Sequence, residues 1–371
     1  MLYSVLAVTA FAVCFLPFGG IFYLSTLTCS WPPESSPHPT VLRALVLSDA
    51  HILGDYRSTL DQVWTDWSLQ TSFAMIRQRF QPDIVLNIGD ILDEGSRSTK
   101  REYRSYLKRA QKIFLLRSRS SSSSKAKNPT APTSFSTALS TGTLPQYTTV
   151  GNHDIGWRFL NDQRLRTYER DHHPSNEFFE LHNLTFARIN SMALHPDADY
   201  MGQGQRHRRE IDAMLANRTH VDVLLTHQPL YRSNDLQCGA ERQQDSQQGG
   251  TTYYPASQTL REDDDVVNQD YTQRILEQWT PTTVLSGHLH SACRFTHPGG
   301  FKELTIPTFS WRMRPDPKYF LIAFQSNGEM AATQCDLPHE HMVFVVGALW
   351  LVVCAVLARR DWNRNTHIKV K

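Results

Sequence analysis

Short apolar runs recur along the central part of the chain, and polar residues follow five of them directly. Short runs that are mainly apolar are typical of strands buried on both faces of a sheet. Two longer segments, residues 60–80 and 100–116, space their apolar residues as helices do. This mixture of strands and helices favours an α/β domain. The five runs are residues 41–47, 84–88, 146–150, 221–225 and 284–286.

The polar residues after these runs are carboxylates, amides and imidazoles. Because the carboxyl ends of parallel strands meet along one edge of a sheet, we expect these side chains to come together there. A single polar turn or a lone buried histidine is more often structural than functional. Seven such residues after five successive strands instead indicate a metal site. They are Asp49, His51, Asp90, Asn152, His227, His288 and His290.

The composition of this ligand set limits the choice of metal. Two aspartates, one asparagine and four histidines, without a thiolate, suit Mn²⁺, Fe or Zn²⁺ better than copper or an iron–sulfur cluster. Seven ligands are too many for one tetrahedral ion. We therefore expect two divalent ions roughly 3.5–4 Å apart, with one carboxylate bridging them.

The same motifs, in this order, resemble a known superfamily. Asp-x-His, Gly-Asp-x-x-Asp, Gly-Asn-His-Asp, His and Gly-His-x-His look like the five blocks of calcineurin-like metallophosphoesterases. The resemblance implies an α/β fold of two packed β-sheets flanked by helices, and hydrolysis by in-line attack at phosphorus. It implies that His153 protonates the leaving oxygen and that Asp93 holds the imidazole of His153. It assigns Asp49, His51 and His290 to one ion, Asn152, His227 and His288 to the other, and Asp90 to the bridge.

Both ends of the chain carry long apolar segments. Residues 1–28 have no charged side chain and are long enough to cross a bilayer, as a transmembrane helix or a signal anchor. Residues 342–358 form a second candidate span, with a buried core helix as the alternative. The basic tail, residues 359–371, predicts a cytosolic C-terminus by the positive-inside rule. Residues 29–40 are then a linker, and residues 41–338 form a lumenal metallophosphoesterase domain.

Sequons, cysteines and charge agree with a lumenal domain. Asn183 and Asn217 each begin an N-glycosylation triplet. Because the basic tail accounts for the formal net charge of +2, the remainder has no basic excess that would indicate a nucleic-acid partner. Four cysteines outside the apolar ends can pair in an oxidising compartment, in three connectivities that the sequence does not distinguish. They are Cys29, Cys238, Cys293 and Cys335.

Two polar segments interrupt the domain. Residues 117–145 are rich in Ser, Thr, Pro and Ala and are predicted to be a disordered insert. Residues 237–265 are rich in Gln, Gly and Asp and are predicted to be a mobile loop. Neither segment supplies a candidate metal ligand, so the predicted site does not depend on them.

Longer stretches around the motifs resemble one branch of the superfamily. Residues 49–54, 151–156, 225–232, 285–293 and 306–314 look like the membrane-bound metallophosphoesterase 1 family, which includes yeast cell-division-cycle relatives. That resemblance implies a phosphodiesterase, typically using Mn²⁺, that removes an ethanolamine-phosphate side branch from a mannose of the GPI anchor. It implies action between the endoplasmic reticulum, its exit sites and the Golgi membrane. GPI-anchored proteins would be the substrates, and cargo receptors of the early secretory pathway are further candidate partners.

Two other classes of function stay open. Another membrane-bound metallophosphoesterase of this fold would act on a lipid, a nucleotide or a phosphoprotein, although phosphoprotein phosphatases are soluble cytosolic enzymes. A non-catalytic receptor for GPI-anchored cargo is the second alternative, and the intact ligand set argues against it. The serine-rich insert departs from the pattern of the metallophosphoesterase 1 family, which affects expectations about loop contacts and leaves the metal ligands unchanged.

Overall fold

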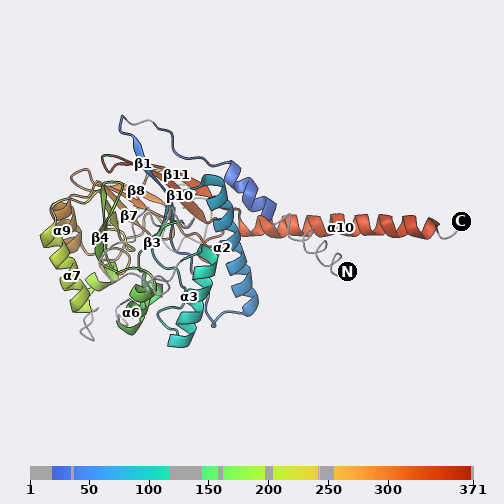
Figure 1. Cartoon of the computed structure of the whole chain (residues 1–371), viewed down its shortest axis with the longest axis horizontal. Coiled ribbons are helices and arrows are strands. Elements are labelled where there is room, and N and C mark those ends of the chain that lie inside the picture. Colours follow the sequence, from blue (N-terminus) through green and yellow to red (C-terminus); the bar gives the residue numbers. More distant parts are fainter. Residues whose placement is uncertain are drawn as a thin grey trace, which may run out of the picture.

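The protein folds into an α/β domain from which one long helix extends (Figure 1). The computed structural model describes residues 19–34, 37–116, 144–157, 162–196, 204–240, 242 and 255–368. Most of the predicted first span and nearly all of the predicted insert at residues 117–145 therefore lie outside the described residues. The same holds for the middle of the predicted loop at residues 237–265.

The first sheet has five strands in the order β11-β10-β1-β2-β3. β1 pairs in parallel with β2, and β2 pairs in parallel with β3. β10 and β11 complete the sheet with antiparallel pairing. The strands are β1 (Thr40–Leu47), β2 (Ile84–Asn87), β3 (Gln146–Thr148), β10 (Lys318–Gln325) and β11 (Met330–Asp336).

The second sheet has six strands in the order β4-β5-β6-β7-β9-β8. Its four central strands run parallel, and the outer strands β4 and β8 are antiparallel to their neighbours. The strands are β4 (Glu177–Leu181), β5 (Leu184–Arg188), β6 (Val223–Leu225), β7 (Thr283–Ser286), β8 (Cys293–Thr296) and β9 (Lys302–Thr305).

The two sheets pack face to face, and helices cover their outer faces (Figure 1). β1 illustrates the division, because successive strand residues point to opposite faces. Ala44 and Val46 pack in the layer between the sheets, whereas Leu45 and Leu47 pack against the helices of the first sheet. These helices are α2 (Thr59–Phe80) and α3 (Lys100–Phe114), and the second sheet is covered by α7 (Gly204–Asn217) and α9 (Gln269–Trp279).

Local signals explain where α2 and α3 begin. The side chain of Ser58 caps α2 by accepting from the backbone N–H of Asp61. Thr99 and Glu102 form a reciprocal capping box at the start of α3. The predicted helices at residues 60–80 and 100–116 are confirmed. The helical spacing of the apolar residues in 60–80 would place Val63 on the buried face of α2, but its side chain is 61% exposed.

The expectation that all five ligand-bearing strands end along one edge of a single sheet is wrong. β1, β2 and β3 belong to the first sheet, whereas β6 and β7 belong to the second. The polar ends meet because the two sheets pack together with these strand ends on the same side. Three short elements lie among the connections, namely α5 (Asn152–Ile155), α6 (Asp162–Asp171) and η2 (Ser191–Leu194).

Two disulfides settle the pairing that the sequence leaves open. Cys29 pairs with Cys335, and Cys238 pairs with Cys293. The first bond ties the segment before β1 to β11, close to the point where the last helix leaves the domain. Both bonds are consistent with an oxidising compartment.

The last helix, α10, runs from Glu340 to Ile368. Its first 18 residues have a mean hydropathy of 2.2 and are only 11% buried, so this helix is long and apolar enough to cross a membrane. It continues through residues 359–368 of the predicted basic tail. Among the described residues no other helix meets this test, and the first helix is seen only from residue 19 to residue 27.

Candidate metal centre

The ligand candidates sit on an unusual backbone. Asp49, His51, Asp90, His288 and His290 all have positive φ angles, between 47° and 69°. Non-glycine residues rarely adopt this left-handed conformation, which costs about 1–3 kcal/mol each and tends to occur at functional sites. Backbone hydrogen bonds between neighbouring loops hold it, because the N–H groups of Asp49 and His51 donate to the carbonyls of Gly89 and Asp90.

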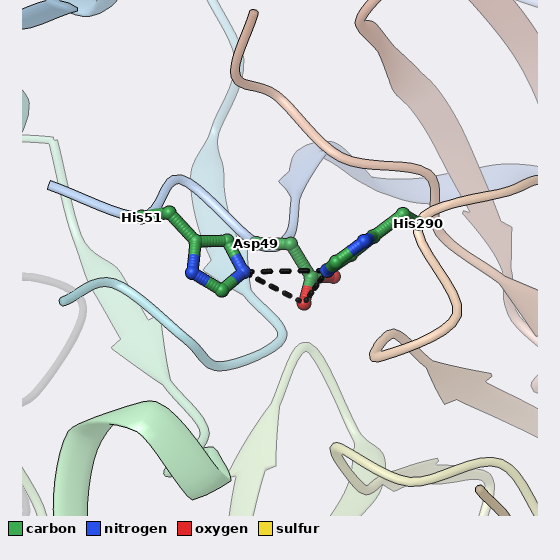
Figure 2. Close-up of side chains that lie close together, drawn as sticks. All are labelled: Asp49, His51 and His290. Atoms are coloured by element: carbon green, nitrogen blue, oxygen red, sulfur yellow. Dashed lines mark hydrogen bonds and ion pairs between the residues drawn. The ribbon is translucent and has the colours of Figure 1, made fainter. Parts of the chain in front are cut away.

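One cluster contains Asp49, His51 and His290, whose side chains point toward one another (Figure 2). The Nε2 atoms of His51 and His290 lie 3.3 Å apart. Asp49 Oδ1 lies 3.5 Å from His290 Nε2 and 3.8 Å from His51 Nε2. Asp49 Oδ1 is buried and has no hydrogen-bond partner. Buried oxygens are nearly always paired, so this atom indicates a ligand position.

Asp93 and Ser48 orient the side chains of this first cluster. The carboxylate of Asp93 lies 3.2 Å from His51 Nδ1, so neutral His51 carries its proton on Nδ1 and turns the Nε2 lone pair into the cluster. Ser48 donates to Asp49 Oδ2 at 2.5 Å, and the N–H of His288 donates to the same oxygen at 3.1 Å. Those two bonds leave Asp49 Oδ1 for a cation.

A second cluster contains Asp90, Asn152, His227 and His288. His227 Nδ1 donates to the carbonyl of Ile88 at 2.7 Å, which leaves the Nε2 lone pair free in the neutral ring. His227 Nε2 lies 3.2 Å from Asn152 Oδ1 and 3.3 Å from Asp90 Oδ2. Three lone-pair atoms therefore converge, which suits a cation.

His288 offers the second cluster its Nδ1 atom, whereas His227 offers its Nε2 atom. His288 Nε2 donates to the carbonyl of Asp264 at 3.0 Å, so Nδ1 is the nitrogen left for a metal. The ring of Trp157 packs edge-on against His288 at 5.6 Å between centroids. Trp157 itself donates to the carbonyl of Asp263, so the loop at residues 263–264 fixes both rings.

Asp90 lies between the two clusters. Its Oδ2 atom is 3.3 Å from His227 Nε2 in one cluster and 3.8 Å from His51 Nε2 in the other. Its Oδ1 atom accepts a hydrogen bond from the backbone N–H of His153 at 2.8 Å. Among the described residues, no other candidate ligand has a carboxylate oxygen in ion-pair contact with ring nitrogens of both clusters. This position matches the bridging role that the resemblance implies.

His153 stands at the rim, with its side chain 40% exposed. Its Nδ1 bonds to the backbone carbonyl of Asp93 at 2.7 Å, which leaves Nε2 able to exchange a proton. The Asp93 carboxylate is farther from His153 Nδ1, at 3.7 Å, than from His51 Nδ1, at 3.2 Å. Asp93 therefore contacts His153 mainly through its backbone, while its carboxylate holds His51.

Asp154 is not among the residues singled out from the sequence, but in the structure its side chain connects two ligand-bearing loops. Its side chain is buried and accepts from the N–H of Leu92 and from the N–H of Gly151, each at 3.0 Å. These bonds tie the loop after β2 to the loop after β3, and so hold Asp90 beside Asn152. Its place as the fourth residue of Gly-Asn-His-Asp was the only available signal.

Comparison with known proteins gives the same answer as this geometry. The family model of the calcineurin-like phosphoesterases matches residues 42–292, which include all seven candidate ligands. The chain belongs to this family. It is a metal-dependent phosphoesterase with a dinuclear metal-binding fold, and the two clusters around Asp90 supply the candidate metal ligands.

Individual relatives cover nearly the whole phosphoesterase. It is 30% identical over 375 residues to metallophosphoesterase 1 of Ailuropoda melanoleuca, an alignment that covers 94% of this chain and 87% of that protein. It is 29% identical to metallophosphoesterase 1 of Cricetulus griseus, with 90% and 84% covered. A dimetal phosphatase from Danio rerio has a similar fold, with a TM-score of 0.50 and 11% identity over 80% of this chain and 97% of that one.

The electrostatics of the phosphoesterase site fit bound cations. Burial alone would lower the pKa of His51, but hydrogen bonds to Asp49 and Asp93 outweigh it and raise the pKa to about 10. Burial opposes protonation of His227 too, yet the charge of Asp90 raises its pKa to about 9. Without metal, protons therefore occupy ring nitrogens that face the carboxylates. Two divalent ions would supply the missing positive charge there, neutralise a phosphoryl group and activate a water molecule.

Proposed function

We propose that this phosphoesterase is a phosphodiesterase that removes an ethanolamine-phosphate branch from a mannose of the GPI anchor glycan. Its substrates would be GPI-anchored proteins on their way from the endoplasmic reticulum to the Golgi. The proposal is supported by the resemblance of five extended sequence stretches to the membrane-bound metallophosphoesterase 1 family. It is also supported by the similarity to proteins named metallophosphoesterase 1.

The observation that carries the chemical part of the proposal is a half-exposed imidazole beside a dinuclear ligand set. The two leaving groups of an ethanolamine-phosphate diester are alkoxides, which leave poorly unless they are protonated. His153 is anchored by Nδ1 and by its backbone N–H, so its Nε2 can deliver that proton at the rim. The seven ligands would hold the two ions, and hard oxygen donors mixed with imidazoles support Mn²⁺, with Fe or Zn²⁺ as alternatives.

A lumenal position in the early secretory pathway is part of the proposal. Two disulfides and a long apolar C-terminal helix support it. The two sequons lie on exposed residues, Asn183 and Asn217, where glycans can be accommodated. Cargo receptors are candidate partners because they meet the same substrates, and the sequence offers no reason to expect nucleic acid.

The GPI glycan mass profile of cells that lack the protein tests this function. We expect a retained ethanolamine-phosphate branch that the wild-type chain removes and Asp90→Asn does not. Asp270→Asn, on an exposed residue at the start of α9, is the matched control and should act as the wild type does. An unchanged glycan profile would exclude this substrate.

Two further outcomes distinguish the alternatives. If the purified wild type hydrolyses a soluble phosphodiester while the glycan is unchanged, the enzyme acts on another lipid or nucleotide phosphoester. If it binds GPI-anchored proteins without hydrolysing any ester, it is a receptor.

A further inference from the structure

An aromatic cluster joins the catalytic domain to the start of α10. Trp64 of α2 stacks on Phe344 of α10 with ring centroids 5.2 Å apart, and Trp64 Nε1 donates to Glu340 at 2.9 Å. Trp64 also stacks on Trp67 at 5.0 Å and on Trp311 at 5.8 Å. Since Phe344 lies within the apolar part of α10, the first half of α2 lies where that helix leaves the domain (Figure 1).

The first helix belongs to the same arrangement. Phe22 lies 5.5 Å from the ring of Trp67 and 5.6 Å from the ring of Trp311, and it is buried by them. The disulfide between Cys29 and Cys335 fastens the end of this helix near the start of α10. The first helix and α2 therefore flank the exit of α10 on one side of the domain.

Large apolar side chains are exposed on these two flanking helices. On α2, Leu60 is 82% exposed and Val63 is 61% exposed, one turn before the two tryptophans. Tyr56, in the preceding loop, is 76% exposed. A soluble surface rarely gathers exposed apolar residues in this way, so the patch indicates a partner. The patch, hereafter the flanking patch, consists of Tyr23, Leu24, Leu27, Tyr56, Leu60 and Val63.

We infer that the flanking patch lies in the headgroup layer of the bilayer that α10 crosses, and seats the catalytic domain on the membrane. The occupant is a lipid surface because the patch is continuous with a helix suited to cross one. Tyrosine and tryptophan at its edge suit the boundary between apolar and aqueous phases. The inference rests on a membrane-spanning α10 and does not depend on which phosphoester is cleaved.

This seating limits where the substrate can be. Tyr56 follows the ligand His51 by five residues, a length of chain that spans at most about 18 Å. The backbone N–H of Tyr56 donates to Glu94, and that of Asp55 donates to the hydroxyl of Tyr106, so this loop is fastened to the catalytic domain. The metal centre thus stays near the bilayer surface, and a phosphoester carried on a membrane-anchored molecule is presented within its reach.

Fluorescence quenching in the full chain, reconstituted into zwitterionic vesicles, tests the contact. A single fluorescent label is attached at Leu60→Cys. The two cysteines outside the disulfides named above, Cys14 and Cys354, are changed to Ser so that they do not react with the label. Lipids with a nitroxide near the headgroup should quench this label strongly. The same label at Gln278→Cys, on α9 at the far side of the domain, should not be quenched (Figure 1).

A third label separates the possible failures. Val352→Cys lies in α10 and should be quenched by nitroxides placed deeper in the bilayer. If Val352→Cys is quenched and Leu60→Cys is not, the flanking patch does not touch lipid and the inference is wrong. If neither is quenched, α10 does not span and the inference falls with it. A Leu60→Cys label shielded from both aqueous iodide and lipid would assign the patch to a protein contact instead.

Activity provides an independent measurement. Leu60→Asp/Val63→Asp should reduce hydrolysis of a phosphodiester carried on vesicles by tenfold or more, relative to a soluble aryl phosphodiester. Both residues are exposed, so the fold should be kept, and activity on the soluble substrate confirms it. Gln273→Asp/Gln278→Asp adds the same charge to α9 and should leave the ratio of the two activities unchanged. If the ratio of vesicle-borne to soluble activity is the same in the wild type and in both double variants, the flanking patch does not seat the domain on the membrane.

Discussion

At the scale of single residues, the hydrogen bonds of the histidine rings determine which nitrogen atoms remain for metal ions. His51, His227 and His288 each have one nitrogen bonded to a carboxylate or a backbone carbonyl, which leaves the other for an ion. The ligand identities could be predicted from the sequence because each follows an apolar strand. The carbonyl partners, Ile88 and Asp264, could not, since any residue supplies a backbone carbonyl and the sequence pattern does not mark it.

His153 should matter in proportion to the basicity of the leaving group. His153→Ala removes Nε2 but no atom of the two clusters, so the metals should be retained. Activity on an alkyl phosphodiester should fall by roughly 10²–10⁴-fold, and activity on an aryl phosphodiester clearly less. Loss of the metals would make His153 a ligand. An equal loss on both substrates would assign His153 to positioning of the phosphate.

Metal binding should release protons at neutral pH. The pKa values of about 10 for His51 and about 9 for His227 mean that both rings are protonated on both nitrogens, and so positively charged, in the metal-free protein at neutral pH. Burial lowers the pKa of His288 to about 4, so that ring is already neutral. Ions must displace the protons of the first two rings, and affinity should rise between pH 6 and pH 8. Calorimetry in two buffers of different ionisation enthalpy counts the protons, and an affinity independent of pH would contradict this.

At the scale of elements, strands with apolar runs were predictable and polar ones were not. β1 and β2 lie close to the predicted runs at residues 41–47 and 84–88. β11 was missed because its sequence, MAATQCD, lacks an apolar run and most of its residues are only partly buried. The split of the ligand strands between two sheets is a matter of long-range pairing, which local patterns do not encode. The resemblance to a two-sheet family, not the strand pattern, supplied that feature.

The turn after β3 leaves no room for a side chain at Gly151. A Cβ atom there would lie 2.2 Å from Asp90 Oδ1 and 2.5 Å from the backbone nitrogen of Asp90. Gly151→Ala should therefore displace the bridging carboxylate, lower the unfolding free energy by about 1–3 kcal/mol and reduce metal occupancy. Gly20→Ala, where a Cβ meets nothing within 4 Å, is the control. Normal occupancy in Gly151→Ala would mean that the loop can shift without cost.

At the scale of the whole molecule, the disulfides and α10 are the features on which the proposed membrane topology depends. The sequence limited four cysteines to three pairings, and only the fold shows that Cys29 meets Cys335. The N-terminal span stays a prediction, because most of residues 1–28 lie outside the described part. Where the membrane lies is therefore inferred from α10 and the aromatic cluster at its start.

The proposed topology has a direct biochemical consequence. Asn183 and Asn217 are exposed and should both carry glycans, so a glycosidase should shift the mass of the wild type by two glycans. Asn183→Gln and Asn217→Gln should each remove one. In intact microsomes, protease should cleave the C-terminal tail and spare the glycosylated domain. A C-terminal tail protected from protease, or a chain without glycans, would contradict the proposed orientation.

Elemental analysis of the purified full chain tests the dinuclear centre most directly. We expect about two transition-metal ions per chain in the active wild type. Asp90→Asn should lose most of both, because its carboxylate faces both clusters, whereas His290→Ala should reduce occupancy less. Asp270→Asn should keep both ions. An active preparation with one ion or none, or an Asp90→Asn variant that keeps two, would contradict the central claim.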